Sequence, residues 1–245
     1  MKRINYVVAN WKMNGVRSFD KIFKDINKHL VSKKAIKLNV IVCPPFTLIN
    51  TLALHKKFKI ILGAQDTHEK DSGAYTGCVS SEMIKDIGAQ YVIIGHSERR
   101  QYFNEDVKLL SEKILTAHKS KLKVIFCIGE LKGEIKNRIS VLKKQLKSLP
   151  NKLDHKNLII AYEPVWAIGT GLTPTLDEID QIHSSIRTIL KSNQNFSKNV
   201  SILYGGSVNA GNAKDILSLE NVDGALVGGA SLKFKDFSKI IDYYL

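Results

Sequence analysis

Short apolar runs recur along the chain, and each is followed by a longer stretch in which apolar residues return with a helical period. Within each run the apolar residues are continuous, as in parallel strands that are buried on both faces. Their starting positions differ by 34, 20, 31, 32, 35, 42 and 24 residues, which leaves room for one crossover helix each time. The predicted strands are Tyr6–Ala9, Val40–Cys43, Ile60–Ala64, Tyr91–Ile94, Lys123–Ile128, Leu158–Tyr162, Val200–Tyr204 and Gly224–Val227.

The segments between these runs carry helix signals. One helix is predicted to begin at Ser18, because the apolar residues after it share a face at spacings of three and four. Thr175 and Glu178 have the spacing of a capping box ahead of an apolar stripe. The stretches Asp106–Ser120 and Asn209–Leu219 follow the same pattern.

Eight strand-and-helix units without a Pro-, Ser- or Gly-rich linker predict one α/β domain over residues 1–245. We expect a single-domain (β/α)8 barrel of the TIM-barrel class, with an open doubly wound sheet as the alternative. A chain of 245 residues with 44% apolar content is long enough to bury the core of such a barrel. In a (β/α)8 barrel, chemistry takes place at the carboxyl ends of the strands.

The formal charge of +14 is compatible with a nucleic acid, an anionic membrane surface or an acidic small molecule as partner. The lysines are spread over the whole chain, without a dense basic tail and without interleaved aromatic residues. We therefore interpret most of them as solvated helix faces that favour the capture of anions, and we predict neither a nucleic-acid nor a membrane partner.

The cysteines favour a reducing compartment. Cys43, Cys78 and Cys127 are too few and too scattered for a disulfide framework, and no pair has the spacing of a zinc site. No His, Asp or Glu spacing indicates a metal. No stretch approaches ~18 apolar residues, and the first residues do not resemble a signal peptide. We expect a soluble cytoplasmic protein without a bound metal.

The residues at the ends of the predicted strands are chemically selective. They include an acid that can act as a base, one imidazole, one cation and two glycine pairs, all of which would lie on one rim of the barrel. These residues are Asn10, Lys12, Gln65, Asp66, His96, Glu130, Glu163, Gly205, Gly206, Ser207, Gly228 and Gly229.

Two glycine pairs at consecutive strand ends predict a phosphate cradle. Gly205-Gly206 is followed by Ser207, and Gly228-Gly229 is followed by Ala-Ser. Without side chains the backbone N–H groups can approach an anion closely. Neither pair belongs to a P-loop, and the segment 169–171 is not a dinucleotide fingerprint, because no helix with a third glycine follows it.

His96 and Lys12 are the candidates for polar chemistry on the same rim. His96 follows a strand, and Ser97 and Glu98 suit the start of a helix, whose field opposes an imidazolium. We therefore expect a neutral ring that donates a hydrogen bond. Lys12 stands beyond the first strand, where it can pair with a phosphate or with a developing oxyanion. The histidines on helical patterns receive no role: His29, His55, His118 and His183.

The segment after Glu163 has the composition of a lid. Pro164 and Pro174 stiffen its two ends, whereas Gly169 and Gly171 permit positive φ between them. We expect residues 165–173 to swing as a body and to offer the N–H of Gly169 to a phosphate. Closure would remove water from Glu163 and raise the basicity of its carboxylate.

Over its whole length the sequence resembles the triosephosphate isomerase family. Six motifs carry the resemblance in the same order: "ANWKMNG" (9–15), "GHSERR" (95–100), "CIGE" (127–130), "AYEPVWAIGTG" (161–171), "YGGSV" (204–208) and "DGALVGGASL" (223–232). The resemblance implies interconversion of dihydroxyacetone phosphate and glyceraldehyde 3-phosphate, in glycolysis and gluconeogenesis, with a small phosphorylated triose as substrate.

The resemblance also implies roles for individual residues. Glu163 would move a proton between neighbouring carbons, and His96 would polarise the carbonyl and shuttle protons between the enediolate oxygens. Lys12 would hold the negative field, Asn10 would help to bind substrate, and Glu98 would organise the site from behind. No cofactor is implied, because an acid and a base suffice for a 1,2 proton shift. The phosphate-binding groups would come from Gly169, Ser207, Gly228 and Gly229.

Members of this family usually dimerise by inserting the loop after the third strand into the partner. Here that loop is Gln65–Gly77, so the resemblance implies a homodimer. Two segments depart from the family pattern. Leu172 stands where many members carry a basic residue, with Pro174 close behind it, and residues 131–140 lack the usual Arg-Glu-Ala-Gly stretch. The first leaves the lid's hinge kinetics open, and the second leaves the start of the next helix open.

Two other functions stay open at this point. One is another phosphosugar barrel, such as a pentose-phosphate epimerase, although such sites usually rely on paired acids and often on a metal. The other is a noncatalytic nucleic-acid or anion-binding protein that has kept the fold, which the charge of +14 motivates.

Overall fold

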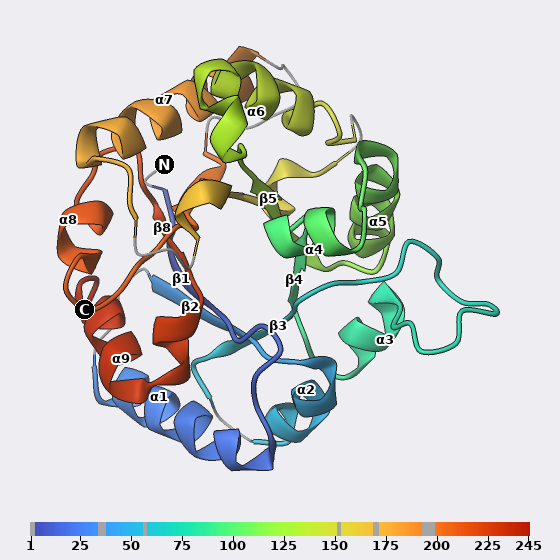
Figure 1. Cartoon of the computed structure of the whole chain (residues 1–245). Coiled ribbons are helices and arrows are strands. Elements are labelled where there is room, and N and C mark those ends of the chain that lie inside the picture. The colour runs from blue at the N-terminus through green and yellow to red at the C-terminus, as the bar shows by residue number, and fades with distance from the viewer. Residues whose placement is uncertain (1–2, 34–37, 56–57, 151–152, 169–171, 193–198) are drawn as a thin grey trace.

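Eight parallel strands close into a barrel in which each strand pairs with the next and β8 pairs with β1 (Figure 1). The computed structural model describes residues 3–33, 38–55, 58–150, 153–168, 172–192 and 199–245. The closed (β/α)8 barrel is confirmed, and the open doubly wound sheet is excluded. The strands are β1 (Asn5–Asn10), β2 (Leu38–Cys43), β3 (Ile61–Ala64), β4 (Tyr91–Ile94), β5 (Lys123–Ile128), β6 (Leu158–Tyr162), β7 (Ser201–Tyr204) and β8 (Gly224–Val227).

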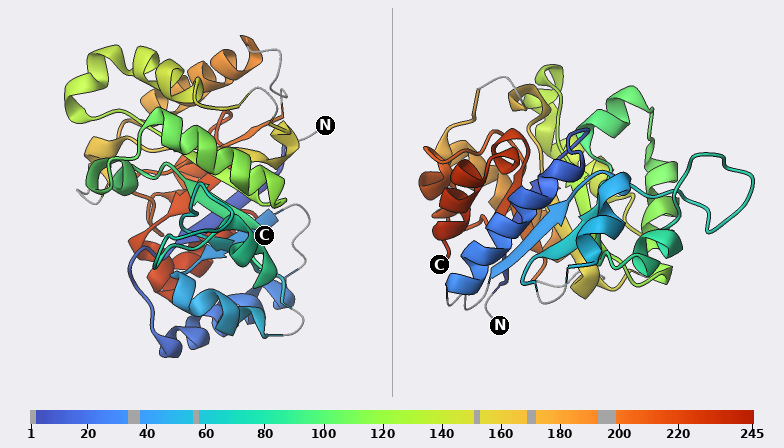
Figure 2. Two further views of the ribbon diagram at one scale, coloured as in Figure 1. Left: turned by 90° about the vertical axis from the view of Figure 1, so that its right-hand side faces the viewer. Right: turned by 90° about the horizontal axis from the view of Figure 1, so that it is seen from below.

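Helices form a ring around the barrel and cover the outer faces of its strands (Figures 1 and 2). The α-helices in the described residues are α1 (Asp20–Ser32), α2 (Phe46–Ala53), α3 (Ser81–Asp86), α4 (Ser97–Tyr102), α5 (Val107–Lys119), α6 (Arg138–Leu146), α7 (Leu176–Ser192), α8 (Ala213–Leu217) and α9 (Phe234–Asp242). Short 3-10 segments lie at η1 (Arg17–Phe19), η2 (Lys132–Asn137), η3 (His155–Asn157), η4 (Val165–Ala167) and η5 (Gly229–Leu232).

The local signals at the helix ends account for several of these boundaries. The Thr175–Glu178 capping box is confirmed, since Glu178 accepts from the backbone N–H of Thr175 at 2.9 Å and Thr175 Oγ1 accepts from that of Glu178 at 3.2 Å. The first helix starts later than predicted, because residues 17–19 form a 3-10 turn ahead of α1. The helix expected over Asn209–Leu219 is only Ala213–Leu217. The helix after β5, whose start could not be predicted, is α6. It begins at Arg138 and is preceded by η2.

The strands alternate between two buried layers. One cluster fills the barrel interior and includes Ala161 and Leu203, while a second cluster lies between the barrel and its helices and includes Tyr162 and Tyr204. Since successive side chains of a strand point to opposite faces, the residue after Tyr162 points back toward the barrel axis. That residue is Glu163, and this alternation brings its carboxylate into the barrel mouth.

The segment between β3 and α3 extends away from the barrel (Figures 1 and 2). Its base is closed by a hydrogen bond from the N–H of His68 to the carbonyl of Val79, at 2.9 Å. The rings of His68 and Tyr75 pack with their centroids 4.4 Å apart. Residues 72–77 at the tip are exposed. In the described part of the chain, no helix is long and apolar enough to cross a membrane.

Candidate active site

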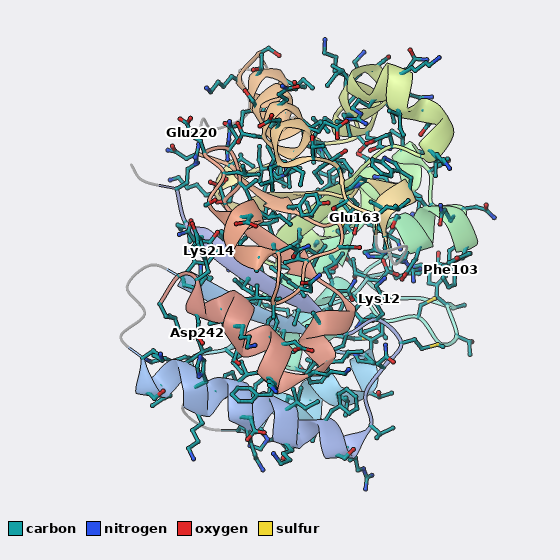
Figure 3. The ribbon with its side chains drawn as sticks, turned by 60° about the vertical axis from the view of Figure 1, so that its left-hand side comes forward. Lys12, Phe103, Glu163, Lys214, Glu220 and Asp242 are labelled. Atoms are coloured by element: carbon teal, nitrogen blue, oxygen red, sulfur yellow. The ribbon has the colours of Figure 1, made fainter. Side chains whose placement is uncertain are left out.

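A pocket of about 340 Å³ opens at the carboxyl ends of the strands. Figure 3 shows Lys12 and Glu163 at this end of the barrel, whereas Glu220 lies at the other end. The lining residues come from the ends of β1, β4, β6, β7 and β8: Asn10, Lys12, His96, Glu163, Ile168, Gly205, Gly206, Ser207, Val208, Asn209, Leu226, Gly228, Gly229 and Ala230. The strand-end residues predicted to share one rim are therefore brought together, except for those discussed below.

Glu163 is the carboxylate of the pocket, and it is only 2% exposed. Its backbone N–H donates to the carbonyl of Ile128 at 2.7 Å, so the residue continues the β5–β6 ladder by one position. The carboxylate is held at both oxygens. Oε2 accepts from the backbone N–H of Ser97 at 3.0 Å, and Oε1 lies 3.1 Å from Nε2 of His96.

Two glycines leave room for Glu163. A Cβ at Gly129 would lie 1.7 Å from the carbonyl oxygen of Glu163, and a Cβ at Gly205 would lie 2.8 Å from its Cγ. Both distances are too short for any other residue, so the base can sit where it does only because its neighbours lack side chains. Gly129 lies inside the "CIGE" motif, whose pattern gives no sign of this role, and the sequence pattern of Gly205 indicates only a phosphate contact.

His96 caps the N-terminus of α4 with its own ring. Its Nδ1 accepts from the backbone N–H of Glu98 at 3.2 Å, so that nitrogen carries no proton. The proton of a neutral ring is then on Nε2, which faces Glu163 across 3.1 Å. This tautomer fits the predicted neutral imidazole that donates a hydrogen bond from Nε2 into the pocket.

Lys12 reaches the pocket from a strained backbone. Its φ of 52° lies in the left-handed region, and the amide side chain of Gln65 donates to its carbonyl at 2.9 Å. The Lys12 ammonium pairs with Glu98 at 2.6 Å. Asn10 supports the same turn, because its Oδ1 accepts from the backbone N–H of Lys12 at 3.0 Å. Gln65 therefore holds the backbone of Lys12 in place from behind.

The two glycine turns line one side of the pocket. A Cβ on Gly229 would meet nothing within 4 Å, while one on Gly228 would touch Lys12 Cε at 3.4 Å, so the backbone here borders open space. Ser207 donates its hydroxyl to the carbonyl of Ala167 in η4 at 2.9 Å, which ties this turn to the segment after Glu163. Gly169, the remaining predicted phosphate contact, lies outside the described residues.

Glu130 does not line the pocket, although it stands at a strand end. Its fully buried carboxylate accepts from the hydroxyl of Tyr162 and from the indole N–H of Trp166, each at 3.1 Å. Arg138 lies 3.5 Å from it. Trp166 belongs to η4, so Glu130 anchors the beginning of the predicted lid to the layer behind the barrel.

Asp66 also points away from the pocket. It pairs with Lys113 at 2.7 Å and with Arg99 at 2.9 Å, and Glu105 binds the same two cations. Burial raises the pKa of Asp66, and the charge of Lys113 opposes this shift. The four groups attach α4, which carries His96 at its start, to β3 and α5.

Arg100, the last residue of the "GHSERR" motif, also supports the rim of the pocket. Its guanidinium donates to the carbonyls of Gly95 and Cys127 at 2.7 and 2.9 Å, which joins the ends of β4 and β5. Burial lowers the pKa of Arg100. The described residues contain no group of three or more His, Cys, Asp or Glu side chains arranged to hold a metal ion.

Comparison with known proteins agrees with the resemblance described above over nearly the whole chain. A sequence model of the triosephosphate isomerase family matches residues 5–244. The chain is 45% identical to a triosephosphate isomerase of Rhizobium meliloti (strain 1021), with 97% of this chain and 95% of that protein covered. It is 44% identical to one of Zygosaccharomyces bailii, with 99% of each covered.

A solved structure agrees with these relatives. The crystal structure of triosephosphate isomerase from Bartonella henselae superimposes with a TM-score of 0.90 at 36% identity, over 98% of each chain. The family match excludes a pentose-phosphate epimerase, and relatives that are isomerases argue against a noncatalytic anion-binding protein. The chain belongs to the triosephosphate isomerase family and is an isomerase that interconverts dihydroxyacetone phosphate and glyceraldehyde 3-phosphate, a step of glycolysis.

Proposed function

We propose that Glu163 is the base of this isomerisation. It removes a proton from the carbon next to the substrate carbonyl, the electron pair forms an enediolate, and the proton is returned to the neighbouring carbon. The observation that carries this proposal is the 3.1 Å contact between Oε1 of Glu163 and Nε2 of His96 at the floor of one small pocket. A buried carboxylate next to a neutral donor is suited to exchange protons with a carbon acid.

His96 is the electrophile in this scheme. The Nε2–H faces the pocket because Nδ1 is occupied by the backbone N–H of Glu98. Donation from Nε2 to the substrate oxygen polarises the carbonyl and stabilises the enediolate, and the same atom can shuttle protons between the two oxygens. A ring held in this tautomer by α4 needs no reorganisation as charge develops.

Lys12 supplies the positive field of the pocket, and Asn10 orders the turn that carries it. Both line the pocket, and the ammonium of Lys12 lies on the side of Gly228. An ammonium in this position stabilises a substrate dianion and the negative charge of the enediolate. Its pairing with Glu98 fixes the ammonium while leaving part of it open to a ligand.

The phosphate of the substrate binds against main-chain N–H groups of the two glycine turns. Gly228 and Gly229 contribute from the end of β8, and Ser207 contributes from the end of β7. Gly169 completes the set when residues 165–173 close over the substrate as a lid. No cofactor takes part, since a base, an electrophile and a phosphate anchor account for the whole reaction.

Glu163→Asp tests this assignment most directly. The shorter side chain retracts the carboxylate by roughly 1 Å from its donors, so we expect kcat to fall about a hundredfold or more with little change in thermal stability. Turnover of glyceraldehyde 3-phosphate in a coupled assay measures the effect, with Glu82→Asp on the exposed face of α3 as matched control. Near-normal turnover of Glu163→Asp would remove Glu163 from the role of base.

The protein is further proposed to form a homodimer through the loop Gln65–Gly77. The loop projects from the barrel, its tip is exposed, and its base is pinned by the bond between His68 and Val79 (Figure 1). Elsewhere on the surface, Met13 is 97% exposed and Phe103 is 62% exposed, which leaves apolar surface for a partner. Sedimentation equilibrium should give twice the chain mass of 27.4 kDa, and a monomer mass at micromolar concentration would reject the dimer.

The proposed compartment is the cytoplasm. Cys43, Cys78 and Cys127 are free thiols in the described structure, and Cys78 is exposed. An exposed thiol is retained most easily in a reducing compartment, where glycolysis also supplies the substrate.

A further inference from the structure

His183, in the middle of α7, is a fully buried histidine that the reaction scheme does not use. The residue is 0% exposed, and within the described structure its ring nitrogens form no hydrogen bond of normal geometry; the backbone of Asn221 lies near the ring and partly opposes the lowering of its pKa. Burial lowers the pKa of the ring to about 3, with the charge of Arg187 one turn further along adding to the effect. The ring is therefore neutral under physiological conditions and acts through its shape.

Two tyrosines pack against this ring. Tyr162, the last residue of β6, meets it edge-on with centroids 5.8 Å apart and planes at 89°. Tyr204, the last residue of β7, lies 6.3 Å from it at 42°. The two tyrosines are themselves 6.5 Å apart, so the three rings form one aromatic cluster between the barrel and α7. Such contacts fix ring orientation as well as burying area.

Each tyrosine is joined to a different part of the active site. Tyr162 precedes Glu163, and its hydroxyl holds Glu130, which in turn anchors Trp166. Tyr204 precedes the Gly205–Ser207 turn, and its hydroxyl lies against Gly206, where an added Cβ would be 2.3 Å away. The backbone N–H of Gly205 donates to the carbonyl of Tyr162 at 2.7 Å, so the two strand ends are also linked directly.

We propose that His183 is a positioning residue for the isomerisation, whose ring fixes Tyr162 and Tyr204 and thereby sets the placement of Glu163 relative to the phosphate-binding turn. This inference rests on the roles proposed above for Glu163 and Ser207. The three rings fill one site between β6, β7 and α7, so the two strand ends are held from behind by one side chain. Misplacement of a reacting group by about 1 Å is enough to cost up to a hundredfold in rate.

The experiment compares two variants of α7 in which a buried side chain is cut back to alanine, at His183 and at Leu190. His183→Ala removes the ring between the tyrosines. Leu190→Ala, the control, removes a buried side chain seven residues further along, roughly 10 Å down the helix axis. His183→Phe restores an aromatic ring, and His183→Leu fills the space without one. All are assayed well below their melting temperatures for kcat, KM and the Kd of 2-phosphoglycolate, a phosphate-bearing mimic of the enediolate.

We expect His183→Ala and His183→Leu to lower kcat/KM about tenfold and to weaken 2-phosphoglycolate binding by a similar factor. His183→Phe should lie within about threefold of the wild type, and Leu190→Ala within about twofold. The proposal is overturned if His183→Leu keeps wild-type kcat and Kd, or if Leu190→Ala loses as much activity as His183→Ala. Should His183→Ala not fold, the Leu and Phe pair alone decides between these outcomes.

The proposals for Glu163 and His183 are tested independently of one another. A normal rate in Glu163→Asp would remove the base from Glu163 whatever His183 does. A tenfold loss in His183→Leu with a large loss in Glu163→Asp supports both. A large loss in Glu163→Asp with an unchanged His183→Leu leaves the base in place and rejects only the positioning residue.

Discussion

The pocket at the strand ends and the aromatic layer behind it each contain a buried histidine, and the two are used in opposite ways. His96 is 6% exposed and has a polar partner at each ring nitrogen, namely the N–H of Glu98 and the carboxylate of Glu163. His183 is 0% exposed, has tyrosine rings for neighbours, and its ring nitrogens form no hydrogen bond of normal geometry in the described structure. Burial is nearly equal, so burial alone does not distinguish a reactive imidazole from a packed one.

The difference lies in what the surrounding backbone offers. At the rim, the first N–H groups of α4 are free to bind acceptors, so the ring of His96 and the carboxylate of Glu163 are both oriented by main-chain donors. In the layer behind, the ring of His183 contributes packing against Tyr162 and Tyr204, while the polar contacts are made by other groups such as the Tyr162 hydroxyl, which donates to Glu130. Adjacent residues of one strand belong to both regions, because Tyr162 faces the layer and Glu163 faces the pocket.

His96→Gln should give the largest difference in kcat between the two histidines. Glutamine keeps a donor near the position of the ring but loses the proton-relay chemistry of imidazole, so we expect kcat to fall about a hundredfold or more. The same change at His183 should lower kcat about tenfold at most, through misplaced rings. Steady-state kinetics on both variants at one pH provides the measurement.

The two variants also differ in the parameter that changes. His96→Gln should leave the Kd for inorganic phosphate near the wild-type value, since the proposed phosphate contacts are those of Ser207, Gly228 and Gly229. His183→Gln should weaken phosphate binding, since Tyr204 supports that turn. Equal losses of kcat in the two variants would contradict the division between a reactive and a packed histidine.

The barrel and most of the pocket could be predicted from the sequence because both depend on local patterns. Continuous apolar runs followed by helical periods indicate parallel strands, and the strand ends then place Asn10, Lys12, His96 and Glu163 on one rim. Strand boundaries differ from the prediction by at most two residues: β2, for example, begins at Leu38 instead of Val40.

What the sequence could not supply are contacts between distant segments. The room that Gly129 leaves for Glu163 depends on the pairing of β5 with β6, and the support of Lys12 by Gln65 spans 53 positions. Glu130 and Asp66 stand at strand ends like the pocket residues, yet their carboxylates find Tyr162 and Lys113 behind the rim. His183 carried no signal either, because an isolated histidine on a helix does not reveal that two strand ends meet it.

The burial of His183 also predicts an effect on acid stability, which is small at neutral pH. This effect tests whether His183 is the packed histidine of the pair. In the unfolded chain a histidine titrates near its ordinary value of 6.5, whereas burial lowers the pKa of folded His183 to about 3. Between these values the unfolded state binds the extra proton, so stability is fully present above pH 6.5 and is lost as the pH falls toward 3. The whole interval corresponds to an upper bound of about 5 kcal/mol.

The test is urea unfolding of the wild type and of His183→Phe at pH 7 and pH 4.5, at one protein concentration. Phenylalanine keeps the packing on Tyr162 and Tyr204 but cannot bind a proton. The wild type should therefore lose about 2–3 kcal/mol more than the variant between the two pH values. Leu190→Ala, which removes no titratable group, should follow the wild-type pH dependence from a lower starting stability. If wild type and His183→Phe lose stability in parallel, the histidine is not buried as a neutral ring, and the packed half of the comparison fails with it.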